Sequence, residues 1–269
     1  MFQFSWLRIN FGIPTVLHES NAFPGASVKF LSKKTGLILA GFEDTKMRLP
    51  KAKKVVVTGT PTKIKDLKLD NNQKEEIRKN LGLQEGLPVV LVFGGSQGAK
   101  SINESLIEMI KNKLNKNYQI MWASGPKQYD QIKEALSESK ISTGKMENVK
   151  IVPYIYNMEE VMNVSDIVVA RSGAMTITEI SKLGKPAIFI PLPYATENHQ
   201  EYNAKVLENI GAAKIVLDKD LNGQILNNTI EEMVKNKETL LKMGEMAKQI
   251  EVKNVEDTIL EECKKLISK

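Results

Sequence analysis

The chain has 269 residues, of which 42% are hydrophobic and 26% are charged, and its formal net charge is +6. This length suits one large or two ordinary domains, and the single cysteine, Cys263, excludes an internal disulfide or a cysteine metal cluster, so reducing cytoplasmic surroundings are expected. The lysines are spread without interleaved aromatic residues, which argues against nucleic acid as a partner, and no apolar run reaches the roughly 18–20 residues of a membrane span.

In chain order, short β-branched apolar runs alternate with longer amphipathic segments. We predict strands at 13–17, 36–40, 54–57, 87–93, 118–123, 149–152, 166–170, 187–190 and 214–217. Helices are predicted at 71–81, 99–114, 127–136, 175–183 and 197–210, and the tail from 222 to 269 indicates two or three further helices without a strand. This alternation predicts an α/β fold with parallel sheets covered by helices on both faces.

A domain boundary is predicted at TGTPTKIK, residues 58–65, because Gly59 and Pro61 interrupt the pattern directly after a strand. From Lys65 onward there are six strand–helix repeats, enough for a complete Rossmann-like domain. The three strands before the boundary form only part of a sheet. The opening MFQFSWLRINFGIP has four aromatic residues and is too short and interrupted for a signal peptide.

Glycine-rich and polar turns follow several of the predicted strands. Gly94, Gly95 and Gly98 surround Ser96 in VFGGSQGAKSI, between a strand and a helix, where free backbone N–H groups bind anions. A second such turn contains Arg171 and Gly173, with Glu179 in the helix behind it. A third leads to Gln200. Because ligands of open α/β sheets bind at the carboxyl ends of the strands, these turns are expected to share one crevice.

Two other interpretations of these residues are possible. Ser96 in the spacing G-x-S-x-G, followed by Asp166 and His199, has the chain order of an α/β-hydrolase triad. However, Asp166 begins a strand and His199 lies in a helix-forming segment, so a hydrogen-bonding role for Ser96 is favoured. Asp218 and Asp220 have the spacing of a metal-binding D-x-D motif, but a solvated helix start with Asp near the N-cap is the simpler interpretation.

The segment HESNAFPG places His18 and Glu19 after a predicted strand, together with Asn21. Such a pair is often structural, but a position in a crevice shared with the second domain would give it a role in a site.

Taken together, the motifs resemble one family. The matching stretches, from about residue 12 to 216, are HESNAFPG, TGTPTK, VFGGSQGAKSIN, VPYIYNM, VVARSGAMTITEISKLGKPAIFIPLPYATENHQEYNAKVL and GAA. The chain is similar to the MurG family of glycosyltransferase family 28, which adds N-acetylglucosamine to lipid I to make lipid II in peptidoglycan synthesis.

The resemblance implies a GT-B fold of two Rossmann-like domains, the N-terminal one incomplete here. Residues 1–58 would be the remnant of the acceptor-binding domain, 59–250 the UDP-sugar domain, and 251–269 a helix that packs back on the first. It also implies an inverting hexosyltransferase that uses UDP-N-acetylglucosamine and lipid I, needs no metal or other cofactor, and is peripheral on the cytoplasmic side of the cell membrane.

The resemblance also assigns site residues. His18 and Glu19 are the candidate bases for the acceptor hydroxyl. The turns containing Gly94, Gly95, Gly98, Arg171 and Gly173 would lie by the diphosphate, with Glu179 on the ribose, Ile155 on the uracil through its backbone and Gln200 on the sugar. The full set of expected donor contacts is Asn21, Lys63, Ser96, Ile155, Ala174, Met175, Thr176, Ile177, Thr178, Glu179 and Gln200.

The chain departs from the family in two places. The family begins with a glycine-rich GGTGGH-type loop and further strand–helix units, whereas residues 1–10 of this chain match poorly. Truncation is therefore expected to expose apolar residues. Transferase activity either survives this truncation or is lost with it, and a non-catalytic UDP-sugar-binding fragment is the alternative function. In TGTPTK, Thr60 replaces the family's Asn and Lys63 its Arg, which keeps the charge but loses the planar fork.

Overall fold

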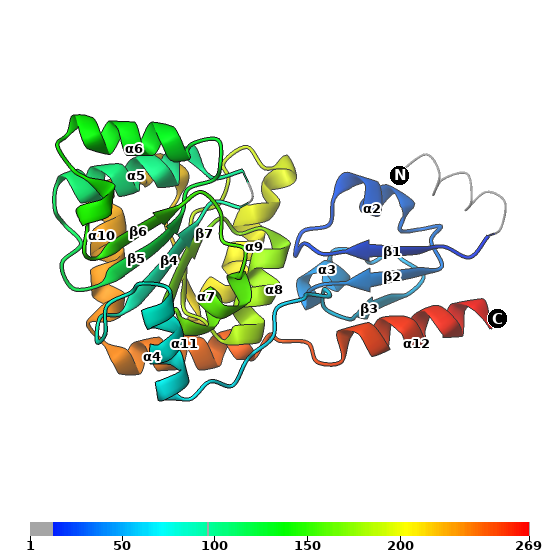
Figure 1. The fold of residues 1–269 in the computed structure, drawn as a ribbon. Helices are drawn as coiled ribbons and strands as arrows, with labels where there is room; N and C mark the ends of the chain where they lie inside the picture. Colours follow the sequence, from blue (N-terminus) through cyan, green and yellow to red (C-terminus); the bar gives the residue numbers. More distant parts are fainter. Residues whose placement is uncertain (1–12, 96, 269) are drawn as a thin grey trace.

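The computed structural model describes residues 13–95 and 97–268, and it consists of two parallel α/β units (Figure 1). The smaller sheet has the order β1-β2-β3 and the larger sheet the order β6-β5-β4-β7-β8-β9. All neighbouring strands in both sheets are parallel. The strands are β1 Val16–Glu19, β2 Leu37–Ala40, β3 Val55–Val57, β4 Val89–Phe93, β5 Gln119–Ala123, β6 Val149–Val152, β7 Ile167–Ala170, β8 Ala187–Phe189 and β9 Ala213–Ile215.

Helices cover both faces of the larger sheet (Figure 1). The α-helices are α2 Ala26–Leu31, α3 Glu43–Met47, α4 Asn71–Asn80, α5 Lys100–Lys111, α6 Tyr129–Glu138, α7 Met158–Val164, α8 Ala174–Leu183, α9 His199–Glu208, α10 Gly223–Val234, α11 Lys237–Lys248 and α12 Val255–Ile267. Short 3-10 turns occur at η1 Thr143–Lys145, η2 Thr196–Asn198 and η3 Asp218–Asp220.

The predicted parallel α/β fold is confirmed, and each of the nine predicted strands has a counterpart among the described residues. The tail after residue 222 contains α10, α11 and α12 and no strand, also as predicted. The largest differences in strand boundaries are at β1, which begins three residues later than expected, at β4, which begins two residues later, and at β9, which ends two residues earlier. The short helices α2, α3 and α7 were not predicted.

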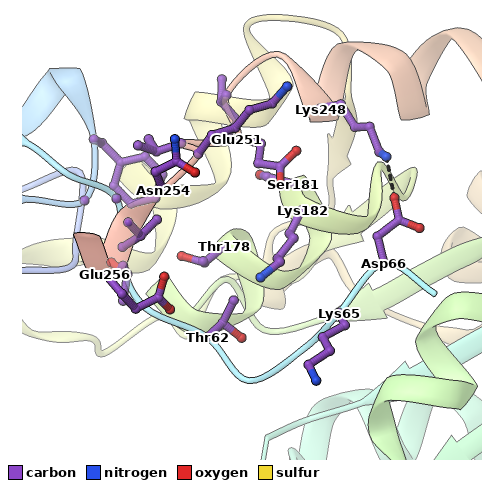
Figure 2. A pocket seen from close by; sticks show the side chains of 18 of the residues that line it. Thr62, Lys65, Asp66, Thr178, Ser181, Lys182, Lys248, Glu251, Asn254 and Glu256 are labelled. Atoms are coloured by element: carbon purple, nitrogen blue, oxygen red, sulfur yellow. Dashed lines mark hydrogen bonds and ion pairs between the residues drawn. The ribbon is translucent and has the colours of Figure 1, made fainter. Parts of the chain in front are cut away.

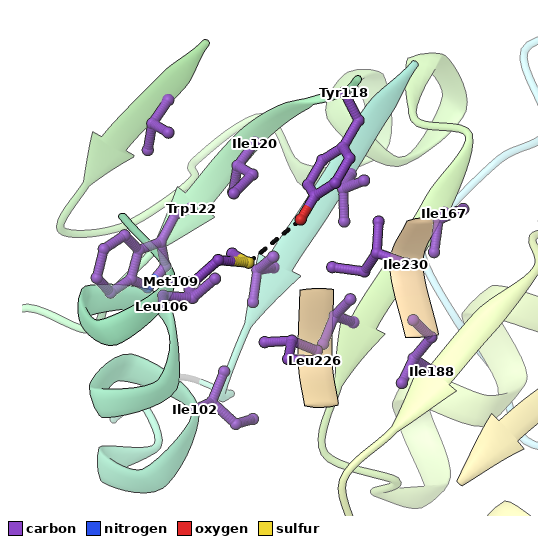
Figure 3. Packing of buried hydrophobic residues seen from close by; sticks show 14 of the residues in the cluster. Ile102, Leu106, Met109, Tyr118, Ile120, Trp122, Ile167, Ile188, Leu226 and Ile230 are labelled. Atoms are coloured by element: carbon purple, nitrogen blue, oxygen red, sulfur yellow. Dashed lines mark hydrogen bonds between the residues drawn. The ribbon is translucent and has the colours of Figure 1, made fainter. Parts of the chain in front are cut away.

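The core of the larger unit lies on both faces of its central strands. Every residue of β4, β5 and β7 is buried. On the face covered by α5 and α10, Trp122 and Tyr118 are fully buried among Leu106, Met109 and Leu226 (Figure 3). Their polar atoms are satisfied, because the Trp122 indole donates to Asn103 Oδ1 at 2.9 Å and the Tyr118 hydroxyl to Asn227 Oδ1 at 2.8 Å.

The smaller unit is built from two separate parts of the chain. Helix α12 returns to lie alongside β3 (Figure 1), where Lys54 forms an ion pair with Glu262. The two chain crossings between the units also touch: a Cβ at Gly59 would lie only 2.8 Å from Val252 Cβ, and Gly59 has φ +72°. This position therefore requires glycine for two independent reasons. In the described part of the chain, no helix combines the length and apolar character needed to span a membrane.

Candidate functional site

The order of the larger sheet defines where a ligand would bind. The chain runs outward from β4 through β5 to β6, then returns to β7 beside β4 and continues outward to β8 and β9. Phe93, the last residue of β4, lies opposite Ala170, the last residue of β7. The strand order thus reverses between β4 and β7, and ligands of open α/β sheets bind in the crevice outside the carboxyl ends at such a point.

The first turn at this point is the glycine-rich one after β4. A Cβ at Gly94 would lie 2.2 Å from the Ala99 nitrogen, and one at Gly98 would lie 2.3 Å from the Ser124 carbonyl oxygen. Gly95 and Gly98 also have φ of +85° and +77°. The turn is therefore tight enough to admit only glycine at these places. Helix α5 follows, and among the described residues no side chain caps its first N–H groups. Ser96 itself lies outside the described residues.

The second turn, after β7, leads to another helix without a side-chain cap. Gly173 is the N-cap residue of α8, and because it has no side chain it cannot cap the helix. Two uncapped helix N-termini thus flank the point where the strand order reverses. Together they place the positive ends of two helix dipoles at the carboxyl ends of β4 and β7, an arrangement suited to a diphosphate.

Arg171 lies in this second turn, but its guanidinium group points to protein acceptors. It donates to the carbonyl oxygens of Ile190 and Pro191 at 2.9 and 3.1 Å and to Ser101 Oγ at 2.9 Å, and it forms an ion pair with Asp218. This side chain ties β7 to the end of β8 and to η3. Any contact of the turn with an anion would therefore come from its backbone.

The same ion pair corrects both interpretations of Asp218. Asp218 accepts from Ser101 Oγ at 2.8 Å in addition to Arg171, so it is neither a solvated helix start nor a free metal ligand. The cap of the following helix α10 is Asn222, which accepts from the Ile225 N–H at 2.8 Å. Within residues 13–95 and 97–268, no three His, Cys, Asp or Glu side chains gather closely enough to hold a metal ion.

Glu179 faces the smaller unit from the second turn of α8. Its carboxylate accepts a hydrogen bond from Thr62 Oγ1 at 3.4 Å, which links α8 to the segment between the units. Burial raises the pKa of Glu179, and the hydrogen bond from Thr62 only partly opposes this shift. A half-buried carboxylate of this kind can accept hydrogen bonds from two neighbouring hydroxyl groups of a ligand.

A pocket of about 590 Å³ lies between the units next to Thr62 (Figure 2). Its walls include Gly41 after β2, Thr178 on α8 and the returning segment around Asn254, and Lys182 extends into it. Thr60 also lines the pocket, but its hydroxyl is buried and has no hydrogen-bond partner among the described residues.

One wall of this pocket contains a compact charge cluster. Lys248 and Lys68 each approach Asp66 Oδ2 at 2.6 Å. Burial alone would raise the pKa of Asp66, but the hydrogen bonds from Lys248 and Lys68 outweigh it and lower the pKa to about 2. The cluster fixes the segment between the units to the end of α11.

His18 and Glu19 lie at the carboxyl end of β1, as predicted, but they differ in availability. Glu19 is buried, and its carboxylate accepts from the Asn21 N–H at 3.0 Å, the Asn21 side-chain amide at 3.1 Å and the Gly25 N–H at 2.8 Å. This carboxylate shapes the loop that follows it. His18 is exposed; its Nε2 lies 3.0 Å from the Gly59 carbonyl and its Nδ1 lies 3.2 Å from Ser20 Oγ. Since a carbonyl only accepts, Nε2 is the donor in the neutral ring, and the Nδ1 lone pair faces Ser20 Oγ.

The other residues predicted to contact the donor differ in solvent exposure. Ile155 and Ile177 have buried side chains in the core of the larger unit, so only their backbones are available to a ligand. Lys63 and Met175 are exposed, and Ala174, Thr176 and Thr178 are partly exposed on α8. Gln200 Oε1 accepts from the Leu192 N–H at 3.0 Å, which leaves its NH₂ group to donate.

The hydrolase geometry is not present. Asp166 lies before the first residue of β7, at the amino edge of the sheet, where it accepts from Arg78 at 3.0 Å and from the Val89 N–H at 2.7 Å. His199 begins α9 beyond the carboxyl end of β8, and its Nδ1 lies 2.8 Å from the Thr196 carbonyl. Asp166 therefore lies at the amino ends of the strands and His199 beyond their carboxyl ends, so the two cannot form a triad.

Sequence reasoning missed three residues that organise the site. Asn203, Ser101 and Thr62 are each bonded to a predicted site segment: Asn203 to Asn21, Ser101 to Arg171, and Thr62 to Glu179. The only sequence signal was their place within the motifs that resemble the family.

Comparison with known proteins identifies the family. The model of the glycosyltransferase family 28 C-terminal domain matches residues 89–259. The UDP-N-acetylglucosamine–N-acetylmuramyl-(pentapeptide) pyrophosphoryl-undecaprenol N-acetylglucosamine transferase of Bacillus cytotoxicus is 40% identical over 96% of this chain and 69% of its own length. The transferase of the same name from Ruminiclostridium cellulolyticum is 37% identical over 95% of this chain and 69% of its own length.

Solved structures share the fold of this chain. The crystal structure of Acinetobacter baumannii MurG superposes with a TM-score of 0.76 and 27% identity, covering 97% of this chain and 69% of that one. A UDP-GlcNAc 2-epimerase from Neisseria meningitidis shares the fold, with a TM-score of 0.62 and 21% identity over 98% of this chain and 73% of its own. The chain belongs to glycosyltransferase family 28, with the GT-B fold, and within it to the MurG family of N-acetylglucosamine-transferring hexosyltransferases.

Proposed function

We propose that the chain binds UDP-N-acetylglucosamine and transfers its sugar to the 4-hydroxyl group of the N-acetylmuramyl residue of lipid I, with inversion at the anomeric carbon. The observation that carries this proposal is the pair of uncapped helix N-termini, α5 and α8, on either side of the strand reversal between β4 and β7. They present N–H donors where a diphosphate would lie.

In this proposal, UDP-N-acetylglucosamine binds along the carboxyl ends of the strands of the larger sheet. The Glu179 carboxylate would accept from the ribose hydroxyls, and the backbone at Ile155, after β6, would pair with the uracil. The side-chain NH₂ group of Gln200 and the side chain of Asn21 would bind the sugar hydroxyls. The exposed Lys63 would add charge near the diphosphate, as a point charge in place of a planar fork.

The transfer itself requires a leaving group and a base. The acceptor oxygen forms a bond to the anomeric carbon as the bond from that carbon to the diphosphate oxygen breaks, so negative charge develops on UDP. The N–H groups of α5 and α8 are oriented in advance to stabilise that charge without a metal. We assign the acceptor proton to His18, because its neutral ring has a lone pair on Nδ1, whereas the Glu19 carboxylate already accepts three hydrogen bonds.

The acceptor implies a place in the cell. The relatives are named for a substrate linked to undecaprenol, a lipid. We therefore infer action at the cytoplasmic face of the cell membrane by peripheral contact.

A second function has one observation in its favour. The larger unit has a complete six-stranded sheet with the proposed donor site, whereas the sheet of the smaller unit has three strands among the described residues. A non-catalytic UDP-sugar-binding protein would need only the former. Turnover of the acceptor substrate separates this function from the first.

Two measurements test the proposal. Calorimetric titration of the purified chain with UDP-N-acetylglucosamine should show saturable binding, and a lipid I analogue should then be converted at a rate comparable with a full-length relative. Binding without conversion would support the non-catalytic function, and the absence of binding would overturn both. A fluorophosphonate probe should leave Ser96 unlabelled.

A further inference from the structure

Asn203, on α9, is fully buried and connects both units at the proposed donor site. Its Oδ1 accepts from the Ala22 N–H at 2.8 Å. Its side-chain NH₂ group donates to Asn21 Oδ1 and to the Ser172 carbonyl, each at 3.1 Å. One amide thus joins the loop after β1, in the smaller unit, to the turn after β7 in the larger unit.

The orientation of Asn21 depends on this contact. The Asn21 backbone and side-chain N–H groups both donate to Glu19 Oε1, and the Asn21 carbonyl accepts from Thr45 Oγ1 at 2.8 Å. The Asn203 side-chain NH₂ group donates to the one remaining polar atom of Asn21, its Oδ1. Without it, the Asn21 side chain would be held on the Glu19 side alone.

Neighbouring side chains hold the same segments together. Tyr202 stacks on Phe23 with ring centroids 4.5 Å apart and planes 16° apart. Lys29 lies 3.8 Å above the Phe23 ring and forms an ion pair with Glu197 at 2.5 Å. The aromatic stack gives α9 and the loop after β1 a broad contact, within which the Asn203 amide fixes the hydrogen-bonding geometry.

We propose that Asn203 is a positioning residue for the donor sugar: it holds Asn21 against the larger unit so that the Asn21 side chain can contact N-acetylglucosamine. This inference rests on the proposed function, because it assumes that Asn21 binds the sugar. Asn203 has no free donor and is fully buried, so it acts through Asn21 and does not touch the substrate.

The proposal predicts a selective loss of affinity. UDP lacks the sugar, and its expected partners lie in the larger unit. Removing the Asn203 amide should therefore weaken binding of UDP-N-acetylglucosamine about tenfold, the size of one or two hydrogen bonds, and leave UDP affinity within about twofold.

The experiment uses the full chain and calorimetric titration with both ligands. Asn203→Ala removes the amide. Asn203→Asp keeps the shape and the acceptor for Ala22 but faces Asn21 Oδ1 and the Ser172 carbonyl with an oxygen, so it should be at least as damaging. Asn209→Ala is the matched control, since Asn209 is the exposed C-cap residue of α9. Asn21→Ala, alone and combined with Asn203→Ala, tests whether the two residues act together, and circular dichroism checks that each variant is folded.

Each outcome decides a separate question. The proposal is supported if both Asn203 variants lose affinity only for the sugar nucleotide, and if Asn203→Ala adds nothing to Asn21→Ala. Unchanged affinity for UDP-N-acetylglucosamine would overturn it, and so would an equal loss for UDP, which would assign Asn203 to the turn after β7. If the unmodified chain binds neither ligand, the proposed function itself fails.

Discussion

The two units of the molecule are stabilised in different ways. In the larger unit, β4, β5 and β7 are buried along their whole length, with apolar clusters on both faces. In the smaller unit only β2 is fully buried, whereas β1 is partly exposed and β3 is intermediate throughout. Apolar burial therefore dominates the first unit, and the second depends more on segments that come to it from elsewhere, namely α12 and α9.

This difference matters for function, because the proposed site draws on both units. The groups expected to bind UDP belong to the well-buried sheet, and those expected to reach the sugar and the acceptor belong to the smaller one. Binding of the nucleotide should thus tolerate changes that disturb transfer. Four predictions test the contrast, from the largest expected effect to the smallest.

Trp122→Ala should lower the free energy of unfolding by about 3–5 kcal/mol, because it leaves a cavity in the core of the larger unit and removes the hydrogen bond to Asn103. Urea denaturation measures this loss. Tyr194→Ala is the control, since Tyr194 is 94% exposed, and it should change the value by less than about 0.5 kcal/mol. Similar losses for the two variants would refute the assignment of stability to this core.

Gly59→Ala should lower the free energy of unfolding by about 2 kcal/mol or more. Alanine is strained at φ +72°, and its Cβ would lie 2.8 Å from Val252 Cβ. Hydrogen exchange should increase mainly in the amides of β1, β2 and β3. Gly144→Ala offers a matched comparison, since no described atom beyond its chain neighbours lies within 4 Å of the added Cβ. Uniform faster exchange in both sheets would show that the units unfold as one.

Glu179 should give opposite pH effects on binding and on stability. Its pKa is raised above the ordinary value of 4.5 by burial, so its contribution to stability is fully present below 4.5 and is lost as the pH rises through the folded-state pKa. Affinity for UDP-N-acetylglucosamine should rise over the same range, because the ionised carboxylate accepts the ribose hydroxyls better.

Glu179→Gln should remove both pH effects and weaken the binding of UDP-N-acetylglucosamine about tenfold. Calorimetry across the pH range measures the binding, and thermal unfolding measures the stability. A variant that kept the pH dependence of binding would place the titrating group elsewhere.

Lys54→Met should have the smallest effect, below about 1 kcal/mol, because the Lys54 side chain is 49% exposed and Glu262 keeps a second partner, Lys265. Denaturation at low and high salt measures the difference, which should shrink at high salt. Lys53→Met, at an exposed neighbouring position, should be neutral. A loss well above 1 kcal/mol would mean that this ion pair holds α12 in place.

The elements that could be predicted were those with strong local patterns. Runs such as Val89–Phe93 are continuously apolar and identified the buried strands, and the glycines of the turn after β4 indicated a close backbone approach. Helices α2, α3 and α7 have only six, five and seven residues, too few to show a clear helical period.

The site was harder to predict, because its side chains are organised by contacts between distant segments. The local sequence does not indicate that the Glu19 carboxylate accepts hydrogen bonds from the loop that follows it. It also does not indicate that Arg171 pairs with Asp218, 47 positions later in the sequence. Asn203 resembles any polar residue of a surface helix until the loop containing Asn21 is placed against it. Such roles follow from the three-dimensional arrangement alone.

The return of α12 to the smaller unit has a consequence for how the molecule can be cut. Because that unit combines β1–β3 with a helix from the far end of the sequence, it is discontinuous and cannot be excised as one stretch of chain. A single nick between the units would leave them joined through the other crossing. Shortening the protein from either terminus, by contrast, damages the same unit.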